Sequence, residues 1–407
     1  MKKTVSKLLA LAMAASLVLS GCGGSGNSGN SEETTGASES EESTSASSEN
    51  EIKDLVIPRL ASRELETFNI LYTQRAEDGE NLTSLVDGLL ESNPKGELVP
   101  CIAEEWGTED GGLTWTFKLR EGVKWVDVNG QEKADCNAQD FATGLEWVLN
   151  FHKNDSANTS MPIEMIEGAS EYYEYTKTLS KEEAYALTAG EGSKFMEMVG
   201  VEIPDDYTLI YHCIEPKPYF DTVATYACLY PMSQAMVDEL GVDGVRGMNN
   251  ENMWYNGCYL MTSYVQGNEK VFTKNPTYWD KDCKLFDTVT IKMVESNDVA
   301  YQLYQSGELD YVDLTESNIQ TISGSESNPY HDQLVEKPSD IYSYQIRFNY
   351  NKNKEDVLWS SIFVTLMANK IGGLQFGIYR NCQISSRVFH TAVAALPLTK
   401  ANRSDFE

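Results

Sequence analysis

The chain has 407 residues, of which 32 are Lys or Arg and 62 are Asp or Glu, so its formal net charge is −30. Such acidity argues against nucleic-acid binding, because a phosphate backbone needs a basic surface and no Lys- or Arg-rich run occurs. The hydrophobic content of 41% suffices for two or three domains, and the longest apolar run, Leu8 to Leu19, is too short to cross a bilayer.

The first 22 residues have the three-part layout of an export signal. Met1 to Lys7 is basic, Leu8 to Leu19 is apolar, and small residues precede Cys22. The layout resembles a bacterial lipoprotein signal with its lipobox, which implies cleavage before Cys22 and acylation of that cysteine. Two or three acyl chains would anchor the protein stably to a membrane. An ordinary secretion signal with a chance cysteine is the alternative.

The segment that follows cannot build a core. Residues 23–51 are rich in Ser, Glu and Gly and contain no aromatic or branched aliphatic residue. Such a segment buries too little apolar surface to offset the entropy lost on ordering. We therefore expect a lipoprotein signal peptide at 1–21 and an acidic, Ser- and Gly-rich flexible tether at 22–51.

The first elements of the folded part alternate between strand and helix. Residues 55–60 predict a short buried strand, and the spacing of apolar residues predicts a helix over 81–90. Residues 113–120 alternate strictly between apolar and polar side chains, which is typical of a half-buried strand. Glu121-Gly122 would then turn the chain into a further strand at 123–125.

Later elements carry capping patterns. Asn137 with Asp140 predicts an amphipathic helix reaching Leu149, and Ser180 with Glu183 forms a capping box for a short helix. Further expected elements are strands at 207–214, 288–294 and 309–312, and a helix at 297–305 that stops at Gly307. Mixed strands and helices without a regular βα repeat predict an α/β or α+β fold.

The cysteines and histidines show no metal-ligand spacing. Seven cysteines follow Cys22 without any C-x-x-C pair, and the four histidines are scattered. We therefore expect no metal and no cofactor. An exported protein could pair some of these thiols, with at least one left free by the odd number, but buried reduced cysteines are equally consistent with the sequence.

Several motifs occur in an order that resembles a known family. They are LTWTFKLREGVKW at 113–125, NAQDF at 137–141, NGCY at 256–259, NPTYWD at 275–280 and GELDYV at 307–312. Their collinear run over about 52–354 resembles ABC-transporter solute-binding lipoproteins of the oligopeptide and dipeptide type, family 5. The resemblance implies an α/β, two-lobed, periplasmic-binding-protein-like fold (type II, cluster C), whose lobes close on a ligand about a hinge.

The resemblance also implies a function. Such a protein captures extracellular oligopeptides and delivers them to the permease of an ABC importer, and it is not an enzyme. We expect an oligopeptide ligand and the permease subunits as partners, no nucleic acid, a monomer, and attachment by lipid to the outer face of the cytoplasmic membrane. A receptor of the same fold for an oligosaccharide, nickel or haem is an alternative. A hydrolase would need a G-x-S-x-G elbow or a metal set, and neither occurs.

Few ligand contacts can be carried over to this chain. Ala61 and Ser62, after the first strand, would offer backbone groups to the ligand, and Asn256 and Tyr259 would lie near the cleft. A structural role without ligand contact is the alternative for each of the four, and the motifs favour it. The family's acidic clamp for the peptide amino terminus would lie in second-lobe sequence that this chain lacks. Four tryptophans are expected in the core rather than in a ligand platform, namely Trp106, Trp115, Trp125 and Trp279.

The expected domains are a first lobe at 52–290, the start of a second lobe at 291–356 and an atypical tail at 357–407. Family members are longer, so we expect the second lobe to be incomplete and peptide binding to be weak or absent. The tail has five basic and two acidic residues, in contrast to the acidic remainder. This change favours a frameshift or a spliced reading frame near Val357, and hence a non-functional copy; a divergent natural ending is the alternative.

Overall fold

The computed structural model describes residues 54–73, 75–93 and 96–335. Backbone contacts divide the chain at Ile52, and every described residue belongs to the second unit. The predictions for the signal peptide, the tether, Cys22, Cys382 and the tail therefore lie outside the described residues. Within the described ranges, each helix is too short or too polar to span a bilayer.

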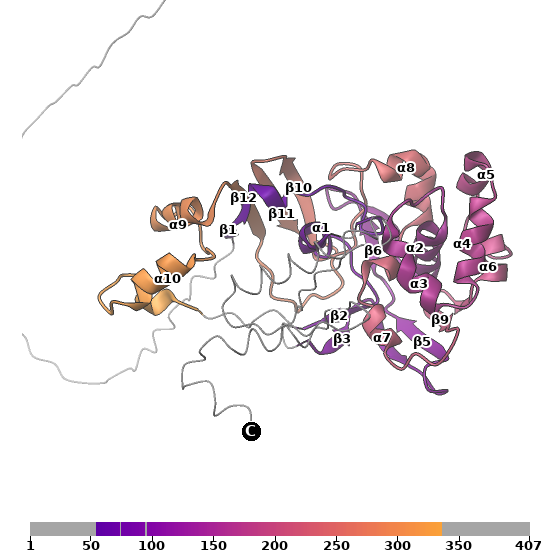
Figure 1. The fold of residues 1–407 in the computed structure, drawn as a ribbon. Coiled ribbons are helices and arrows are strands. Elements are labelled where there is room, and N and C mark those ends of the chain that lie inside the picture. The colour runs from indigo at the N-terminus through magenta and orange to yellow at the C-terminus, as the bar shows by residue number, and fades with distance from the viewer. Residues whose placement is uncertain (1–53, 74, 94–95, 336–407) are drawn as a thin grey trace, which may run out of the picture. The chain divides into compact units, whose positions relative to one another are not determined.

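The described residues form a mixed α/β structure (Figure 1). The strands are β1 (Asp54–Leu60), β2 (Leu90–Ser92), β3 (Leu98–Pro100), β4 (Ala103–Gly107), β5 (Thr114–Leu119), β6 (Lys124–Val126), β7 (Glu132–Asp135), β8 (Val201–Asp205), β9 (Thr208–His212), β10 (Tyr259–Val265), β11 (Glu269–Lys274) and β12 (Thr288–Val294). The helices are α1 (Ala76–Leu82), α2 (Ala138–Leu149), α3 (Ser160–Met165), α4 (Ala169–Lys177), α5 (Lys181–Tyr185), α6 (Lys194–Met198), α7 (Phe220–Val223), α8 (Gln234–Arg246), α9 (Asn297–Gln305) and α10 (Glu316–Ser323). Single 3₁₀ turns are η1 (Ala61–Arg63), η2 (Ala157–Thr159), η3 (Ala227–Leu229) and η4 (His331–Gln333).

Two four-stranded sheets organise these elements. The hinge sheet, as we name it, has the order β1-β12-β11-β10, with β1 parallel to β12 and the other pairs antiparallel. The second sheet has the order β4-β5-β9-β8 and is antiparallel throughout. The pairs β2-β3 and β6-β7 form two short hairpins. Strand β1 thus pairs with a strand far along the chain, so the described part closes on itself.

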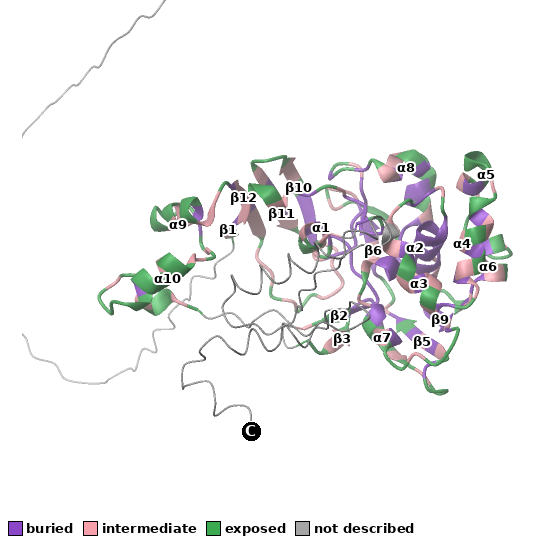
Figure 2. Ribbon diagram, viewed as in Figure 1, coloured by how far each residue is buried: buried purple, intermediate pink, exposed green. Residues whose placement is uncertain are grey.

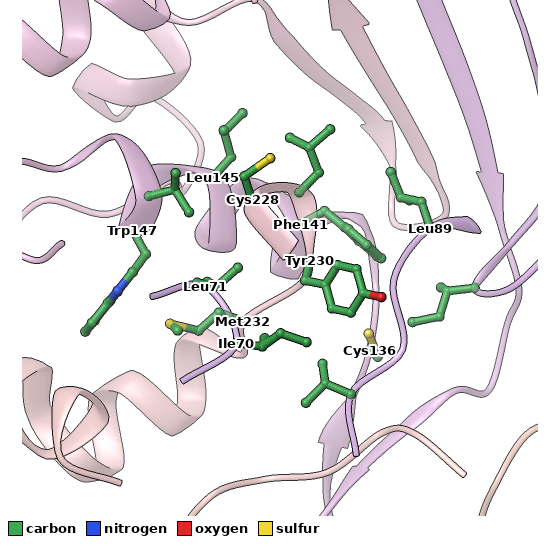
Figure 3. Close-up of a cluster of buried hydrophobic side chains, with 14 of the residues drawn as sticks. Ile70, Leu71, Leu89, Cys136, Phe141, Leu145, Trp147, Cys228, Tyr230 and Met232 are labelled. Carbon is green, nitrogen blue, oxygen red and sulfur yellow. The ribbon is translucent and has the colours of Figure 1, made fainter. Parts of the chain in front are cut away.

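Most buried apolar side chains form one large core around α2 (Figure 2). The segment that carries Tyr230 and Met232 packs against Phe141 and Leu145 of α2 (Figure 3). It approaches so closely that a β-carbon at Gly144 would lie 2.2 Å from the carbonyl oxygen of Tyr230. All residues of α2 except one are buried, so the expected amphipathic helix is wrong in one respect: α2 has no solvent-facing stripe.

A second, smaller core lies on the other side of β1 and β12. It consists of Val294, Ala300 and Leu309, with side chains of β1 and α9 packed against it. Ile291, three residues before Val294, belongs to the large core. Alternate side chains of β12 thus face different cores, Ile291 and Met293 the large one and Val294 the small one, while the predicted domain boundary at 290 stays a prediction.

The predicted helix over 81–90 is wrong. Helix α1 ends at Leu82, and β2 begins at Leu90. The carbonyl oxygen of Leu85 accepts hydrogen bonds from the backbone of Asn256 and Gly257, at 3.2 and 3.0 Å, instead of a helical partner. The five apolar residues that gave the helical spacing are nonetheless buried, because this irregular turn lies inside the large core.

The predicted strand at 309–312 is also wrong, although the segment does lie beside β1. The backbone N–H of Asp310 donates to the carbonyl oxygen of Val56 at 2.9 Å. The reciprocal bond is made by a side chain, since Val56 N–H donates to Asp310 Oδ2 at 2.7 Å. The Asp310 carboxylate therefore accepts the hydrogen bond that a backbone carbonyl would accept in a regular strand pair. Strand β1, expected to be buried, is mostly half-buried because it lies at the edge of its sheet.

The locally determined elements agree with the sequence. The alternating strand at 113–120 corresponds to β5, and the strands at 123–125, 207–214 and 288–294 correspond to β6, β9 and β12. Both capping boxes form, at Asn137 and at Ser180. Gly307 ends α9 with φ +79°. Trp115 and Trp125 are in the large core, and Trp106 and Trp279 pack at its margin.

The cysteines of the described residues are all free thiols. Four of them, Cys101, Cys136, Cys213 and Cys228, are buried, and Cys258 and Cys283 are half-buried. Of the two readings that the sequence left open, reduced cysteines hold for these six. Burial raises the pKa of the Cys228 thiol to about 12, so this group stays protonated and unreactive near neutral pH.

Candidate functional site

The predicted ligand-facing loop is η1, directly after β1. Ala61 and Ser62 are both exposed. Leu60 pairs with Val294 at the end of β12, and this is also the end of the hinge sheet where β10 turns into β11. The loop therefore presents two exposed residues at the end of this sheet where β12 ends.

Two sets of charges fix this loop. On its exposed side, Arg63 pairs with Glu80 at 2.6 Å and with Glu77 at 3.6 Å, and Arg59 pairs with Glu80 at 3.3 Å. These carboxylates belong to α1, so α1 supports the loop from outside. Exposed pairs of this kind contribute little stability each, but several in a network limit the conformations of the loop.

On its inner side, the loop is held by an ion pair with a buried lysine. Glu64, the residue after η1, places Oε1 2.7 Å from Nζ of Lys270 on β11. Glu64 Oε2 also accepts a hydrogen bond from the backbone N–H of Gly267 in the β10–β11 turn, at 2.7 Å. Burial opposes ionisation of Glu64, but the hydrogen bonds from Lys270, Gly267 and Leu65 outweigh it, so the pKa of this carboxyl is lowered.

Asn256 and Tyr259 lie elsewhere and are buried. Asn256 Oδ1 accepts from the backbone N–H of Asp87 at 2.8 Å, and its Nδ2 donates to Sγ of Cys136 at 3.5 Å. The hydroxyl of Tyr259 donates to the carbonyl oxygen of Phe286 at 3.1 Å. The polar groups of both side chains are thus used within the protein, which gives these residues a structural role.

The structure does not bring the four predicted contact residues together. Tyr259 pairs with Lys274, at the end of the hinge sheet where β1 begins, whereas Ala61 follows the other end of β1. Seven strand residues separate the two ends, which is about 20 Å. The exposed loop and the buried Asn256–Tyr259 pair are therefore separate features, and contact of either with a ligand stays a prediction.

Sequence reasoning missed a buried acid next to Asn256. Asp87 Oδ2 accepts a hydrogen bond from Nε1 of Trp279 at 2.8 Å, and the guanidinium of Arg120 lies 4.3 Å from the centre of the Trp279 ring. Burial raises the pKa of Asp87 to about 6, against the lowering effect of hydrogen bonds from Trp279, Cys101 and Tyr278. The single sequence signal is an acid inside segment 82–90, whose five apolar residues predict burial.

A second buried acid gives a testable pH dependence. Burial raises the pKa of Asp140 to about 7, although Trp125 Nε1 donates to its Oδ2 at 2.9 Å. An unfolded Asp has a pKa of about 3.9, so the folded state binds this proton more tightly. The resulting stability is fully present below pH 4 and is lost as the pH rises towards 7.

Asp140→Asn should therefore flatten the fall in the free energy of unfolding between pH 5 and 7, as measured by urea denaturation. Asp110→Asn is the control, because backbone hydrogen bonds from Thr114 and neighbouring groups lower the pKa of exposed Asp110 to about 2. Asp110 is ionised in both states throughout this range, so its replacement should leave the slope unchanged. An unchanged slope in Asp140→Asn would contradict the assignment.

Comparison with known proteins then gives the family. A sequence model described as "Bacterial extracellular solute-binding proteins, family 5 Middle" matches residues 97–358. The chain belongs to this family. It is 29% identical over 289 residues to the oligopeptide-binding protein SarA of Streptococcus gordonii, which covers 70% of this chain and 40% of SarA.

Solved structures of peptide-binding proteins agree with the fold. The murein tripeptide-binding protein MppA of Escherichia coli has a TM-score of 0.62 at 20% identity, covering 84% of this chain and 65% of MppA. Haemophilus influenzae OppA in complex with RPPGFSPFR has a TM-score of 0.54 at 25% identity, covering 68% of this chain and 49% of that one. The predicted family and the α/β fold of two-lobed solute-binding proteins are confirmed. This family 5 chain spans about 40% of the length of SarA.

Proposed function

We propose that this chain belongs to a receptor that captures oligopeptides outside the cell and delivers them to the permease of an ABC importer, without catalysing a reaction. The names of its family 5 relatives support the ligand class: SarA, AmiA and AliA of streptococci are oligopeptide-binding proteins. The structural observation that carries the proposal is the exposed, charge-fixed loop at η1. Exposed backbone groups in a fixed conformation can hydrogen-bond an extended peptide irrespective of its sequence.

Within this proposal, Ala61 and Ser62 supply backbone contacts to the peptide. Asn256 and Tyr259 support the site from inside the core rather than touch the ligand, because their polar groups are used by Asp87, Cys136 and Phe286. The receptor acts as a monomer. Oligosaccharides, nickel and haem are the competing ligands, and the first experiment separates them.

We predict that an oligopeptide mixture at 10 mM stabilises the full chain more than the competing ligands do. A Kd of about 1 mM, as expected for a weak site, would add about 1.4 kcal/mol and raise the melting temperature by about 2–4 °C. Differential scanning calorimetry with peptides, oligosaccharides, nickel and haem in turn measures this shift. A larger shift with any of the other three, or no shift with peptides, would overturn the proposed ligand class.

We further propose that Cys22 carries the lipid that holds the protein on the outer face of the cytoplasmic membrane. Cys22→Ser should move the protein from the membrane fraction to the medium, because serine lacks the thiol that would carry the lipid and no acyl anchor remains. Cys283→Ser, at a half-buried free thiol, is the matched control and should stay with the membrane. Immunoblots of the two fractions decide the matter, and a membrane-bound Cys22→Ser protein would refute the anchor.

A further inference from the structure

The side chain of Lys270 lies on the inner face of β11. Lys270 and Phe272 are both buried and alternate with more exposed neighbours, so the lysine occupies a core-facing position in the strand. Its side chain is 1% exposed. Around Nζ are Glu64 Oε1 at 2.7 Å, Met293 Sδ at 3.2 Å and the ring of Tyr264 at 5.9 Å. Glu64 is the acidic partner of this buried cation.

The carboxylate of Glu64 joins three segments of the chain. Besides Lys270 on β11, it accepts hydrogen bonds from the backbone N–H of Gly267 at 2.7 Å and from that of Leu65 at 2.8 Å. Gly267 lies in the β10–β11 turn, and Leu65 belongs to the large core. Glu64 is also the C-terminal cap residue of η1, only two positions after Ser62. Any shift of the carboxylate therefore moves the loop.

Stability alone is a poor explanation for such a pair. Taking the Lys270 ammonium out of water costs several kcal/mol, while the Glu64 side chain stays 19% exposed, and apolar residues of similar volume often replace such a pair without loss of stability. What an apolar pair cannot do is accept the hydrogen bond of Gly267 N–H and fix the direction of the chain at Glu64. The pair thus determines where the loop lies more than it determines whether the protein folds.

We propose that Glu64 and Lys270 are positioning residues for ligand binding, which lock the Ala61–Arg63 loop in the conformation that presents its backbone to the peptide. The inference rests on the proposed peptide-binding function and assigns to this pair a role in affinity. A loop that is ordered before binding loses less entropy when the ligand arrives. Without the pair, part of the binding free energy would be spent on ordering the loop.

The test is the full chain with the double substitution Glu64→Leu and Lys270→Met. This variant removes both charges while keeping the apolar volume, so its melting temperature should stay within a few degrees of wild type. We expect about tenfold weaker peptide affinity in titrations followed by NMR, with Kd near 10 mM if the wild type binds near 1 mM. Hydrogen exchange at the amides of residues 61–64 should accelerate at least tenfold.

Glu64→Gln combined with Lys270→Met is the second variant in case the first does not fold. It retains an amide oxygen for the Gly267 hydrogen bond and leaves no unpaired charge in the core, so affinity should fall by about threefold and exchange should rise less. Peptide affinity within twofold of wild type, or unchanged exchange at residues 61–64, in a folded variant overturns the inference alone. Absence of peptide binding in the wild type itself overturns the proposed function and this inference together.

Discussion

Replacing Lys153 with methionine is expected to lower the free energy of unfolding by about 3–5 kcal/mol, because it leaves a buried carboxylate without its cation. Lys153 follows α2, and its Nζ lies 2.7 Å from Oε2 of Glu146. The two side chains are only 4% and 2% exposed. Lys153 Nζ also donates to the carbonyl oxygen of Leu187 at 2.6 Å, so the substitution leaves that carbonyl group without this donor as well.

The surroundings of Glu146 cannot compensate for the missing charge. Oε1 of Glu146 already accepts hydrogen bonds from the hydroxyl of Tyr172 and from Nδ2 of Asn150, both at 2.8 Å. These donors are neutral, and they belong to α4 and to the end of α2. The network holds the packing of α2 against α4, so breaking it should loosen the large core around α2.

Urea denaturation at pH 7 measures the effect, with Lys194→Met as the control. Lys194 pairs with Glu197 at 3.2 Å, but these side chains are 44% and 60% exposed. An exposed pair is worth about 0–1 kcal/mol, so the control should unfold almost as the wild type does. Equal losses in the two variants would show that burial of the Lys153–Glu146 pair has no special consequence.

Gly168→Ala is expected to cost about 2–5 kcal/mol, from two independent causes. Gly168 precedes α4 with φ +70°, a left-handed conformation that costs an alanine about 1–2 kcal/mol. A β-carbon there would also lie 1.7 Å from the carbonyl oxygen of Met198. That oxygen belongs to the backbone, so the clash can be relieved only by moving α4 away from the end of α6, which adds about 1–3 kcal/mol.

Gly192→Ala isolates the first cause. Gly192 has the same φ of +70°, and a β-carbon there would meet nothing within 4 Å. This control should lose only about 1 kcal/mol. Thermal unfolding of both variants gives the difference, which measures the close approach of α4 and α6. A Gly168→Ala protein as stable as the Gly192→Ala protein would mean that the contact with Met198 relaxes at no cost.

The elements that sequence predicted correctly are those whose cause is local. The capping box at Asn137 and the alternation in β5 depend on residues a few positions apart, and both are found where they were expected. The helix predicted over 81–90 failed because Leu85 hydrogen-bonds to Asn256 and Gly257, about 170 positions away. The spacing of apolar residues correctly predicted that this segment is buried. It could not predict a backbone hydrogen-bond partner so distant in sequence.

The candidate site was predictable to a similar extent. Ala61 and Ser62 could be placed in a loop because the apolar strand pattern of residues 55–60 ends just before them. Lys270 could have been noticed, since it alternates with Phe272 in a strand pattern and so faces inward. Its pairing with Glu64 could not have been predicted, because one base among 32 and one acid among 62 carry no sign of their partner in the sequence.

The parallel pairing of β1 with β12 has a consequence for how the chain reaches its fold during synthesis. The first described strand leaves the ribosome about 230 residues before the strand that pairs with it, and closing such a loop costs about 5 kcal/mol of chain entropy. A nascent chain therefore retains an unpaired apolar strand near its N-terminus until residue 294 has been made. Pairing so remote in sequence folds slowly. The sheet of β4, β5, β8 and β9 can form earlier, because its last strand ends at His212, so β1 stays unpaired while a later part of the chain already folds.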